Sequence, residues 1–252
     1  MTMNFIFASC LLFVMTSCGN VSSLISQKKS VTSSPDSPLV TENVKVDKLS
    51  AIDTSIGVRV VYTQAGNTSA TVTAPKDIME YIKVKQDGST LECYVDHDYQ
   101  IKSGLDRVVV TVSAPEICTF DASTGGSIEA SSPIELTDKK VEMDASTGGV
   151  ISVNRLVCKE FDGDSSTAGV INVNDILCAG KTSAGASTGG VINLSGKSSK
   201  VDFSASTGGV VDATTLVAYE GEAGASTGGV VNCNVAHLDK STSTGGSVNN
   251  GK

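Results

Sequence analysis

The sequence predicts an all-β protein built around a β-solenoid, a flattened β-helix with two sheets and about seven coils of about 20 residues. Three observations lead to this prediction. The motif Ser-Thr-Gly-Gly or a close variant recurs seven times, with its Thr residues 17 to 23 positions apart. The 252 residues include 25 Gly, 5 Pro and no Trp, which suits strands joined by tight turns. Apolar and polar residues alternate on both sides of each motif, as in strands with one buried face.

The chain begins with an apolar segment that resembles the export signal of a bacterial lipoprotein. Residues 4–18 read NFIFASCLLFVMTSC, a stretch too short to span a membrane as a helix. Its end, MTSC, resembles a lipobox, which is cleaved before the cysteine so that the thiol carries lipid. Residues 1–17 lack the Lys or Arg that usually opens an export signal, so an apolar leader cleaved elsewhere is the alternative.

Residues 1–17 are therefore predicted to be a signal peptide, and Cys18 the lipidation site through which the protein is anchored to a membrane. We expect an exported protein held in the cell envelope at the outer membrane, on its surface or its periplasmic face. Residues 18–40 contain few large apolar side chains and two prolines, a composition typical of a flexible tether.

Residues 41–117 are predicted to form N-terminal strands that lead into the repeats. The segments that indicate them are VDKLSAIDTSIGVRVVYTQ (46–64), DGSTLECYVD (87–96) and RVVVTVSAPEI (107–117). An open end of a solenoid exposes unpaired backbone groups, so we expect these strands to cap its front end.

Residues 118–250 are predicted to be the solenoid itself, each repeat being a strand, a tight turn and a second strand. Residues six and four positions before the repeat Thr are expected to point inward, as in Val141 and Met143 or Val201 and Phe203. The residue four positions after it is always Ile or Val: Ile128, Ile151, Ile171, Ile192, Val211, Val231 and Val248. Dipeptides such as Asn174-Asp175, about ten residues further on, predict a second corner in each coil.

The paired glycines are predicted to be structural, because Gly adopts positive φ without steric cost and so permits a sharp turn at the same place in every coil. These glycines are Gly125, Gly126, Gly148, Gly149, Gly189, Gly190, Gly208, Gly209, Gly228, Gly229, Gly245 and Gly246. In the third copy the pair is Ala168-Gly169 instead.

Taken together, the opening segments and the repeats resemble the bacterial head GIN family of autotransporter adhesins, over roughly residues 41–250. The strand that ends in APEI before the first coil and the seven Gly-rich turns carry this resemblance. It implies a right-handed two-sheet β-superhelix and a role in adhesion, and it brings no catalytic residues.

Five cysteines remain after Cys10 and Cys18, and no spacing among them suggests zinc. Cys158 and Cys178 both lie eleven residues after their repeat Thr, so they are expected to stack in adjacent coils within reach of a disulfide. The alternative, which we favour from sequence, is a pair of small buried apolar side chains.

A row of carboxylates is expected on the outer face of one sheet in the first coils: Asp121, Glu142, Asp144, Asp162 and Asp164. Like charges on adjacent strands repel, so this row is a candidate weak calcium site. A solvated acidic face that discourages aggregation is the favoured alternative, and no metal site is assigned with certainty.

Several classes of function are disfavoured. The net charge of −8 argues against binding nucleic acid, no phosphate-binding loop is present, and nothing indicates a cofactor. His97 and His237 are the only histidines, and no Ser is singled out as a nucleophile.

The sequence therefore favours a non-catalytic binding or adhesion module in the envelope, with a glycan or a host or envelope protein as its partner. The alternatives are a non-adhesive scaffold or spacer and, less favoured, a polysaccharide-acting enzyme. The open ends and flat faces of a solenoid also make a homo-oligomer a further expectation.

Overall fold

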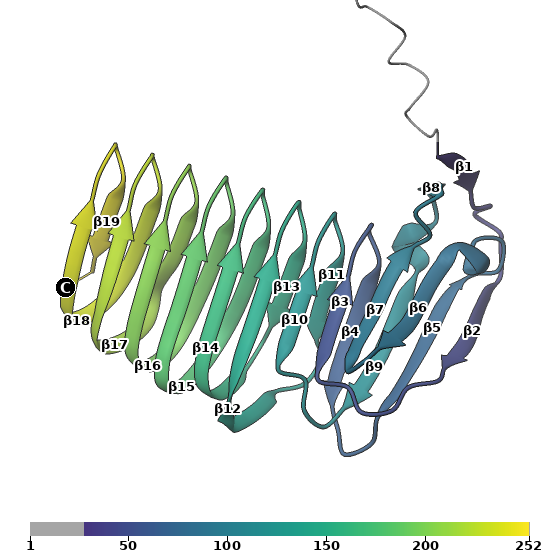
Figure 1. Ribbon diagram of the computed structural model, residues 1–252, viewed down its shortest axis with the longest axis horizontal. Coiled ribbons are helices and arrows are strands. Elements are labelled where there is room, and N and C mark those ends of the chain that lie inside the picture. Colours follow the sequence, from purple (N-terminus) through teal and green to yellow (C-terminus); the bar gives the residue numbers. More distant parts are fainter. Residues whose placement is uncertain (1–27, 252) are drawn as a thin grey trace, which may run out of the picture.

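The computed structural model describes residues 28–251 and shows coils stacked in one elongated row (Figure 1). The predicted signal peptide (1–17), Cys18 and the start of the tether lie outside these residues. Nineteen strands and two short 3-10 helices are present in the described range, and no helix there is long and apolar enough to cross a membrane. The prediction of an all-β solenoid of about seven turns is confirmed.

The strands before the repeats are β1 (Lys29–Thr32), β2 (Leu39–Val44), β3 (Ala51–Thr54), β4 (Arg59–Gln64), β5 (Ser69–Pro75), β6 (Ile82–Asp87), β7 (Thr90–Val95), β8 (Tyr99–Ser103) and β9 (Val109–Ala114). The two 3-10 helices are η2 (Met79–Tyr81) and η3 (Leu105–Arg107). The repeats contain β10 (Thr119–Ala122), β11 (Ser127–Ala130), β12 (Ile134–Ala145), β13 (Val150–Val153), β14 (Leu156–Ser165), β15 (Val170–Ala186), β16 (Val191–Ala205), β17 (Val210–Ala225), β18 (Val230–Thr242) and β19 (Ser247–Asn250).

Two faces of parallel strands run the length of the solenoid and are closed at the front by antiparallel strands. On one face the order is β6, β7, β3, β10 and then β12; on the other it is β2, β5, β9, β4, β11 and then β13. The pairs β6–β7, β5–β9 and β2–β5 are antiparallel, whereas β3–β7 and β4–β9 are parallel. The N-terminal strands therefore continue the two faces of the solenoid and form its front edge.

The predicted tether is too long, because its second half belongs to the fold. Residues 29–32 form β1, which pairs in parallel with β8, and β2 begins at Leu39. The connection between them is held by side chains of the folded part. The Asp77 carboxylate accepts bonds of 2.8 Å from the Ser33 hydroxyl and the Ser34 amide, and the Arg107 guanidinium donates to the carbonyl oxygens of Pro35 and Ser37. These bonds satisfy backbone groups that a polar, proline-containing segment could not satisfy by itself.

The coils stack in register, so equivalent residues form rows along the solenoid. The inward rows predicted from the alternation are buried, and Phe120, Phe161 and Phe203 are among the largest fully buried side chains. Val248 in the last coil and Cys118 in the first repeat are only partly buried. Period-two alternation thus fixes which side chains form the core, because each strand has one face inside.

One coil was missed by the sequence prediction. The coil formed by β3 and β4 stacks in register on β10 and β11, with Asp53 opposite Asp121 and Arg59 opposite Ser127. Its turn, Ser55-Ile56-Gly57-Val58, takes the place of Ser-Thr-Gly-Gly, and Ile56 and Gly57 both have positive φ. The match of DTSIGV (53–58) with DASTGG (121–126) was the available signal.

The two ends of each coil differ. At one edge lie the tight turns, which point upward in Figure 1, and we call this the turn edge. At the opposite edge, the bend edge, the chain bends twice around a short segment such as Ile176–Cys178, where the pairing register shifts on both sides. The predicted second corner is therefore a broad double bend, and all the register shifts between coils lie there.

Side-chain amides pin the register in two places and close the last coil. Asn193 donates to the Oδ1 of Asn172 at 2.8 Å, and Asn249 donates to that of Asn232 at 2.9 Å, all four residues lying in one row of equivalent positions along the coils. Asp212 interrupts the row. In the last coil the Asn250 amide exchanges two hydrogen bonds with the backbone of Val235, of 3.0 and 2.8 Å. The Asn250 side chain thus satisfies backbone hydrogen-bonding groups that would otherwise need a further strand.

Candidate functional site

The tight turns are type I′ turns whose second residue is a threonine. The amide of the second glycine donates to the carbonyl of the motif Ser at 2.8–2.9 Å, and both central residues have positive φ. The Thr φ values are 46–48° in all seven repeats, and those of the following glycines are 73–75°. Asn-Gly is the usual sequence for such a turn, and a β-branched residue with positive φ is a rare and strained choice.

The turns also bond to one another. The amide of the first glycine, or of Ala168 in its place, donates to the carbonyl of the Thr in the next coil at 3.1–3.3 Å. Gly57 begins this series by donating to Thr124 at 3.1 Å. The peptide groups of the turn edge are thereby paired along the stack, and the Thr side chains are left exposed to solvent.

The two glycines of each motif have different roles, which corrects the prediction that both supply positive φ. Only the first has positive φ, and a Cβ placed on it meets nothing within 4 Å. The second has ordinary φ, but a Cβ on it would approach the backbone of the preceding coil to less than 3.0 Å. Gly149, for example, faces the carbonyl of Ala122. The second glycine therefore permits close stacking of the coils.

The third copy of the motif shows the same division of roles. Ala168 replaces the first glycine, has φ 62° and lies in an exposed position. Gly169, the second glycine, is retained, and a Cβ there would collide with the carbonyl of Ala145. The replacement thus falls at the position where a methyl group has space.

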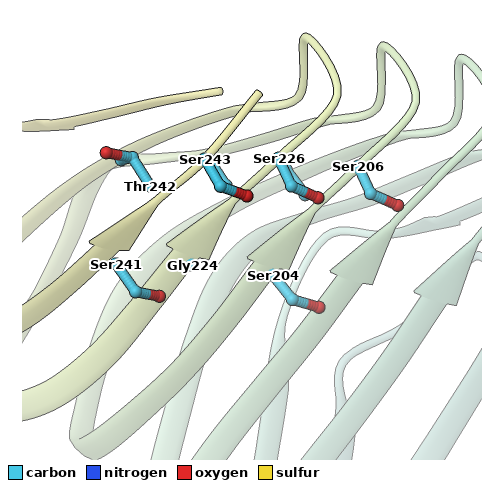
Figure 2. Close-up of a pocket in the computed structure, with 9 residues that line it drawn as sticks. Ser204, Ser206, Gly224, Ser226, Ser241, Thr242 and Ser243 are labelled. Atoms are coloured by element: carbon cyan, nitrogen blue, oxygen red, sulfur yellow. The ribbon is translucent and has the colours of Figure 1, made fainter. Parts of the chain in front are cut away.

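A shallow trough runs beside the turn edge on the face formed by the strands that precede the turns. It lies between two rows of residues. One, the Ser row, consists of the motif serines, and the other consists of the residues two positions before them in the chain. Two adjoining hollows of about 320 and 300 Å³ lie along it. In Figure 2, Ser206, Ser226 and Ser243 point the same way on one side, and Ser204 and Ser241 lie on the other with Gly224 between them.

Toward the N-terminal strands, the outer side of the trough becomes acidic. Asp53, Asp121, Asp144 and Asp164 are paired in register on four successive strands, and we call them the acidic row. Burial, followed by the charge of Asp144, raises the pKa of Asp121 to about 6. The pKa values of Asp53, Asp144 and Asp164 are also raised, again mainly by burial.

The structure divides the five predicted carboxylates into two rows. Glu142 and Asp162 lie in a neighbouring row, and the Lys140 ammonium bridges them at 2.7 and 2.9 Å. No ion pair between residues 28 and 251 involves a member of the acidic row. Over that range no group of three or more His, Cys, Asp or Glu side chains is arranged to hold a metal ion. Asp53, which belongs to the row, was missed by the sequence prediction.

The two histidines are far apart in the fold and neither lines the trough. His97 stacks on Tyr94 near the N-terminal strands, with ring centroids 5.1 Å apart, and His237 packs edge-on against Tyr219 in the later coils. No motif serine therefore has an imidazole beside it within the trough. The trough offers hydroxyl groups, peptide groups and carboxylates.

Most of the chain matches one known protein family. Residues 48–251 match the family model described as putative auto-transporter adhesin, head GIN domain. No curated protein matches the chain.

Three solved structures share the fold. A putative adhesin from Bacteroides fragilis is 19% identical, with a TM-score of 0.68 over 87% of this chain and 99% of that one. A putative adhesin from Parabacteroides merdae is 15% identical, with a TM-score of 0.69 over 89% and 100%. A putative lipid binding protein from Parabacteroides distasonis is 16% identical, with a TM-score of 0.68 over 89% and 100%. Because this family model covers residues 48–251, which contain β3 to β19, the chain belongs to the putative auto-transporter adhesin, head GIN domain family.

Proposed function

We propose that this protein is a non-catalytic binding or adhesion module, anchored in the cell envelope by lipid on Cys18, and that its turn edge is the contact surface. The observation that carries the proposal is the Thr row: Thr124, Thr147, Thr167, Thr188, Thr207, Thr227 and Thr244, each exposed and each at positive φ. A left-handed conformation costs about 1–2 kcal/mol for a residue with a Cβ. Asn would form the same turn more easily.

Backbone strain that recurs at exposed positions is a reason to look for function, because folding alone would not retain it. Here the strained residue presents a hydroxyl and a methyl group at a spacing of about 4.8 Å, the distance between adjacent strands. The Ser row runs beside it along the trough. A partner that follows these rows must be extended and rich in hydrogen-bonding groups, and a linear glycan has both properties.

A glycan screen with matched variants tests the contact surface. The full chain is compared with a variant carrying Thr→Asn at Thr167, Thr188, Thr207 and Thr227, and with a control carrying Thr214→Asn and Thr215→Asn, exposed residues away from the turn edge. We expect the wild type and the control to retain the same linear glycans. The turn-edge variant should remain folded and bind them at least about tenfold more weakly. Equal binding by all three proteins would contradict the assignment of the turn edge.

Exposure on the cell tests the adhesion role against the alternative, an envelope scaffold. Intact cells are treated with protease, and the folded domain is detected with a lysed sample as control. Loss of the domain from intact cells supports adhesion. Protection until lysis excludes an outward-facing adhesin and favours the scaffold.

A further inference from the structure

Cys158 and Cys178 face each other across two successive coils. They are direct partners in the parallel pairing of β14 and β15, and their side chains are 1% and 3% exposed. Adjacent strands lie about 4.8 Å apart, which is inside the range of about 4.4–6.8 Å for the Cα atoms of disulfide-bonded cysteines. The Cys178 thiol donates to the carbonyl oxygens of Lys159 and Lys181, both at 3.4 Å. The pair therefore has the register and the Cα spacing that a disulfide needs.

The surroundings of this pair differ from those of a purely apolar core. Cys158 and Cys178 occupy an inward row at the bend edge that also contains Leu136, Ser198, Ala218 and Val235. The neighbouring Thr182 hydroxyl donates to that of Ser198 at 2.9 Å, and the Ser198 hydroxyl donates to the carbonyl oxygen of Lys200 at 2.8 Å. In the folded state the neighbouring sulfur lowers the pKa of Cys178, whereas the neighbouring sulfur and burial raise that of Cys158.

No other cysteine in the described part of the chain has such a partner. Cys93 is paired with Thr54 and Val84, and Cys233 with Ala213 and Asn250. Cys118 lies at the partly buried start of the first repeat. The relationship between Cys158 and Cys178 is thus particular to one pair of coils.

We propose that Cys158 and Cys178 are a modification site, at which a disulfide bond joins two successive coils of the solenoid. The oxidant is a disulfide, either of a small thiol or of an exchange protein. The thiolate of one of the two cysteines attacks one sulfur of this disulfide and expels the first thiolate. The sulfur of the other cysteine then attacks the mixed disulfide and expels the second thiolate. Two protein thiols are oxidised, the incoming disulfide is reduced to two thiols, and the two protons pass to the leaving thiolates.

Because both thiols are buried, the exchange takes place before the two coils close on each other, while the protein folds. The bond encloses one coil and constrains the unfolded chain, which is how a disulfide stabilises most effectively. This inference concerns the covalent state of the fold and does not depend on the proposed contact surface.

Refolding with a defined oxidant tests the pair directly. The full chain is refolded with oxidised glutathione, quenched with N-ethylmaleimide under denaturing conditions and digested with trypsin. Cleavage after Arg155, Lys159 and Lys181 places Cys158 and Cys178 in separate peptides. We expect these peptides to be recovered joined by a reducible bond. Recovery of both cysteines as alkylated thiols, or of either joined to another cysteine, would overturn the proposal.

A stability measurement with a matched control completes the test. Adding dithiothreitol to the oxidised wild type should raise its unfolding equilibrium constant about a hundredfold. The double variant Cys158→Ala, Cys178→Ala should show no response. Cys233→Ala removes an equally buried cysteine, 1% exposed, and should keep the wild-type response. A wild type that is insensitive to reductant contradicts the proposal, whatever the outcome of the glycan screen.

Discussion

The Cα of Gly149 faces the carbonyl oxygen of Ala122 in the preceding coil so closely that a Cβ on Gly149 would fall inside the 3.0 Å limit of real contacts. Its neighbour Gly148 has positive φ and open space around it. Two consecutive glycines in one motif thus serve coil stacking and turn conformation separately.

Alanine substitutions at these two positions should therefore differ sharply. Gly149→Ala should cost about 3 kcal/mol or more, because the clash is with backbone and the coils must separate. Gly148→Ala should cost about 1 kcal/mol, the penalty of the left-handed conformation. Denaturant unfolding of both variants measures the difference. Equal costs would contradict the assignment of Gly149 to coil stacking.

Ala168→Gly should stabilise the protein. Ala168 has φ 62°, so its methyl group carries a left-handed penalty that glycine removes. The gain should be up to about 1 kcal/mol, reduced by the greater flexibility of glycine in the unfolded chain. Thermal unfolding of the two proteins under one condition is the measurement, and a lower midpoint for the glycine variant would contradict the expectation.

Thr207→Asn should also stabilise the fold, by about 1 kcal/mol, because Asn adopts positive φ more easily than a β-branched residue. Thr215→Asn is the matched control: Thr215 is exposed in β17 and does not have positive φ, so no gain is expected. The denaturation midpoints of the two variants distinguish relief of strain from a general effect of Asn. An equal gain in stability in both variants would show that strain at Thr207 is not its cause.

The acidic row should make stability fall as the pH rises. The folded protein holds a proton on Asp121 up to a pKa of about 6, whereas the unfolded chain releases it near the ordinary aspartate pKa of 3.8. Between these two values the folded state binds more protons, so the free energy of unfolding decreases with increasing pH and then levels off.

Asp121→Asn should therefore raise stability by about 1 kcal/mol near pH 7.5 and have little effect near pH 4. Asp202→Asn is the control, because the Asp202 carboxylate is exposed and lies 3.2 Å from the Lys181 ammonium, so this change removes an ion pair and not a half-buried carboxylate. The denaturation midpoint is followed across this pH range at low salt. A variant of Asp121 that gains nothing near neutral pH contradicts the prediction.

Much of the fold can be predicted from the sequence because its information is local. Alternation with a period of two identifies the buried side chains of each strand, and the repeated glycines mark the turns. The pairing of Cys158 with Cys178 follows from their equal distance from the repeat Thr.

The remaining features depend on contacts between coils or oppose local preferences. The role of Gly149 requires the position of Ala122, which lies in another coil. The positive φ of Thr147 contradicts the preference of a β-branched residue. The coil formed by β3 and β4 does not match the repeat motif, because Ile56 and Val58 stand in place of Thr and Gly. The connection between β1 and β2 is held by Asp77 and Arg107, which lie far from it in the sequence.

The confinement of the register shifts between coils to the bend edge has a consequence for how such a protein changes over generations. Coils of 17 to 23 residues share an identical turn, and the surplus or deficit is absorbed at the opposite edge. In-frame duplication or loss of one repeat unit would lengthen or shorten the rod by about 4.8 Å and leave every other coil seated as before. Insertions within the bends would change the local shape and keep the ordered rows intact. The length of the solenoid and the shape of its bends can thus evolve independently of the surface that the turns present.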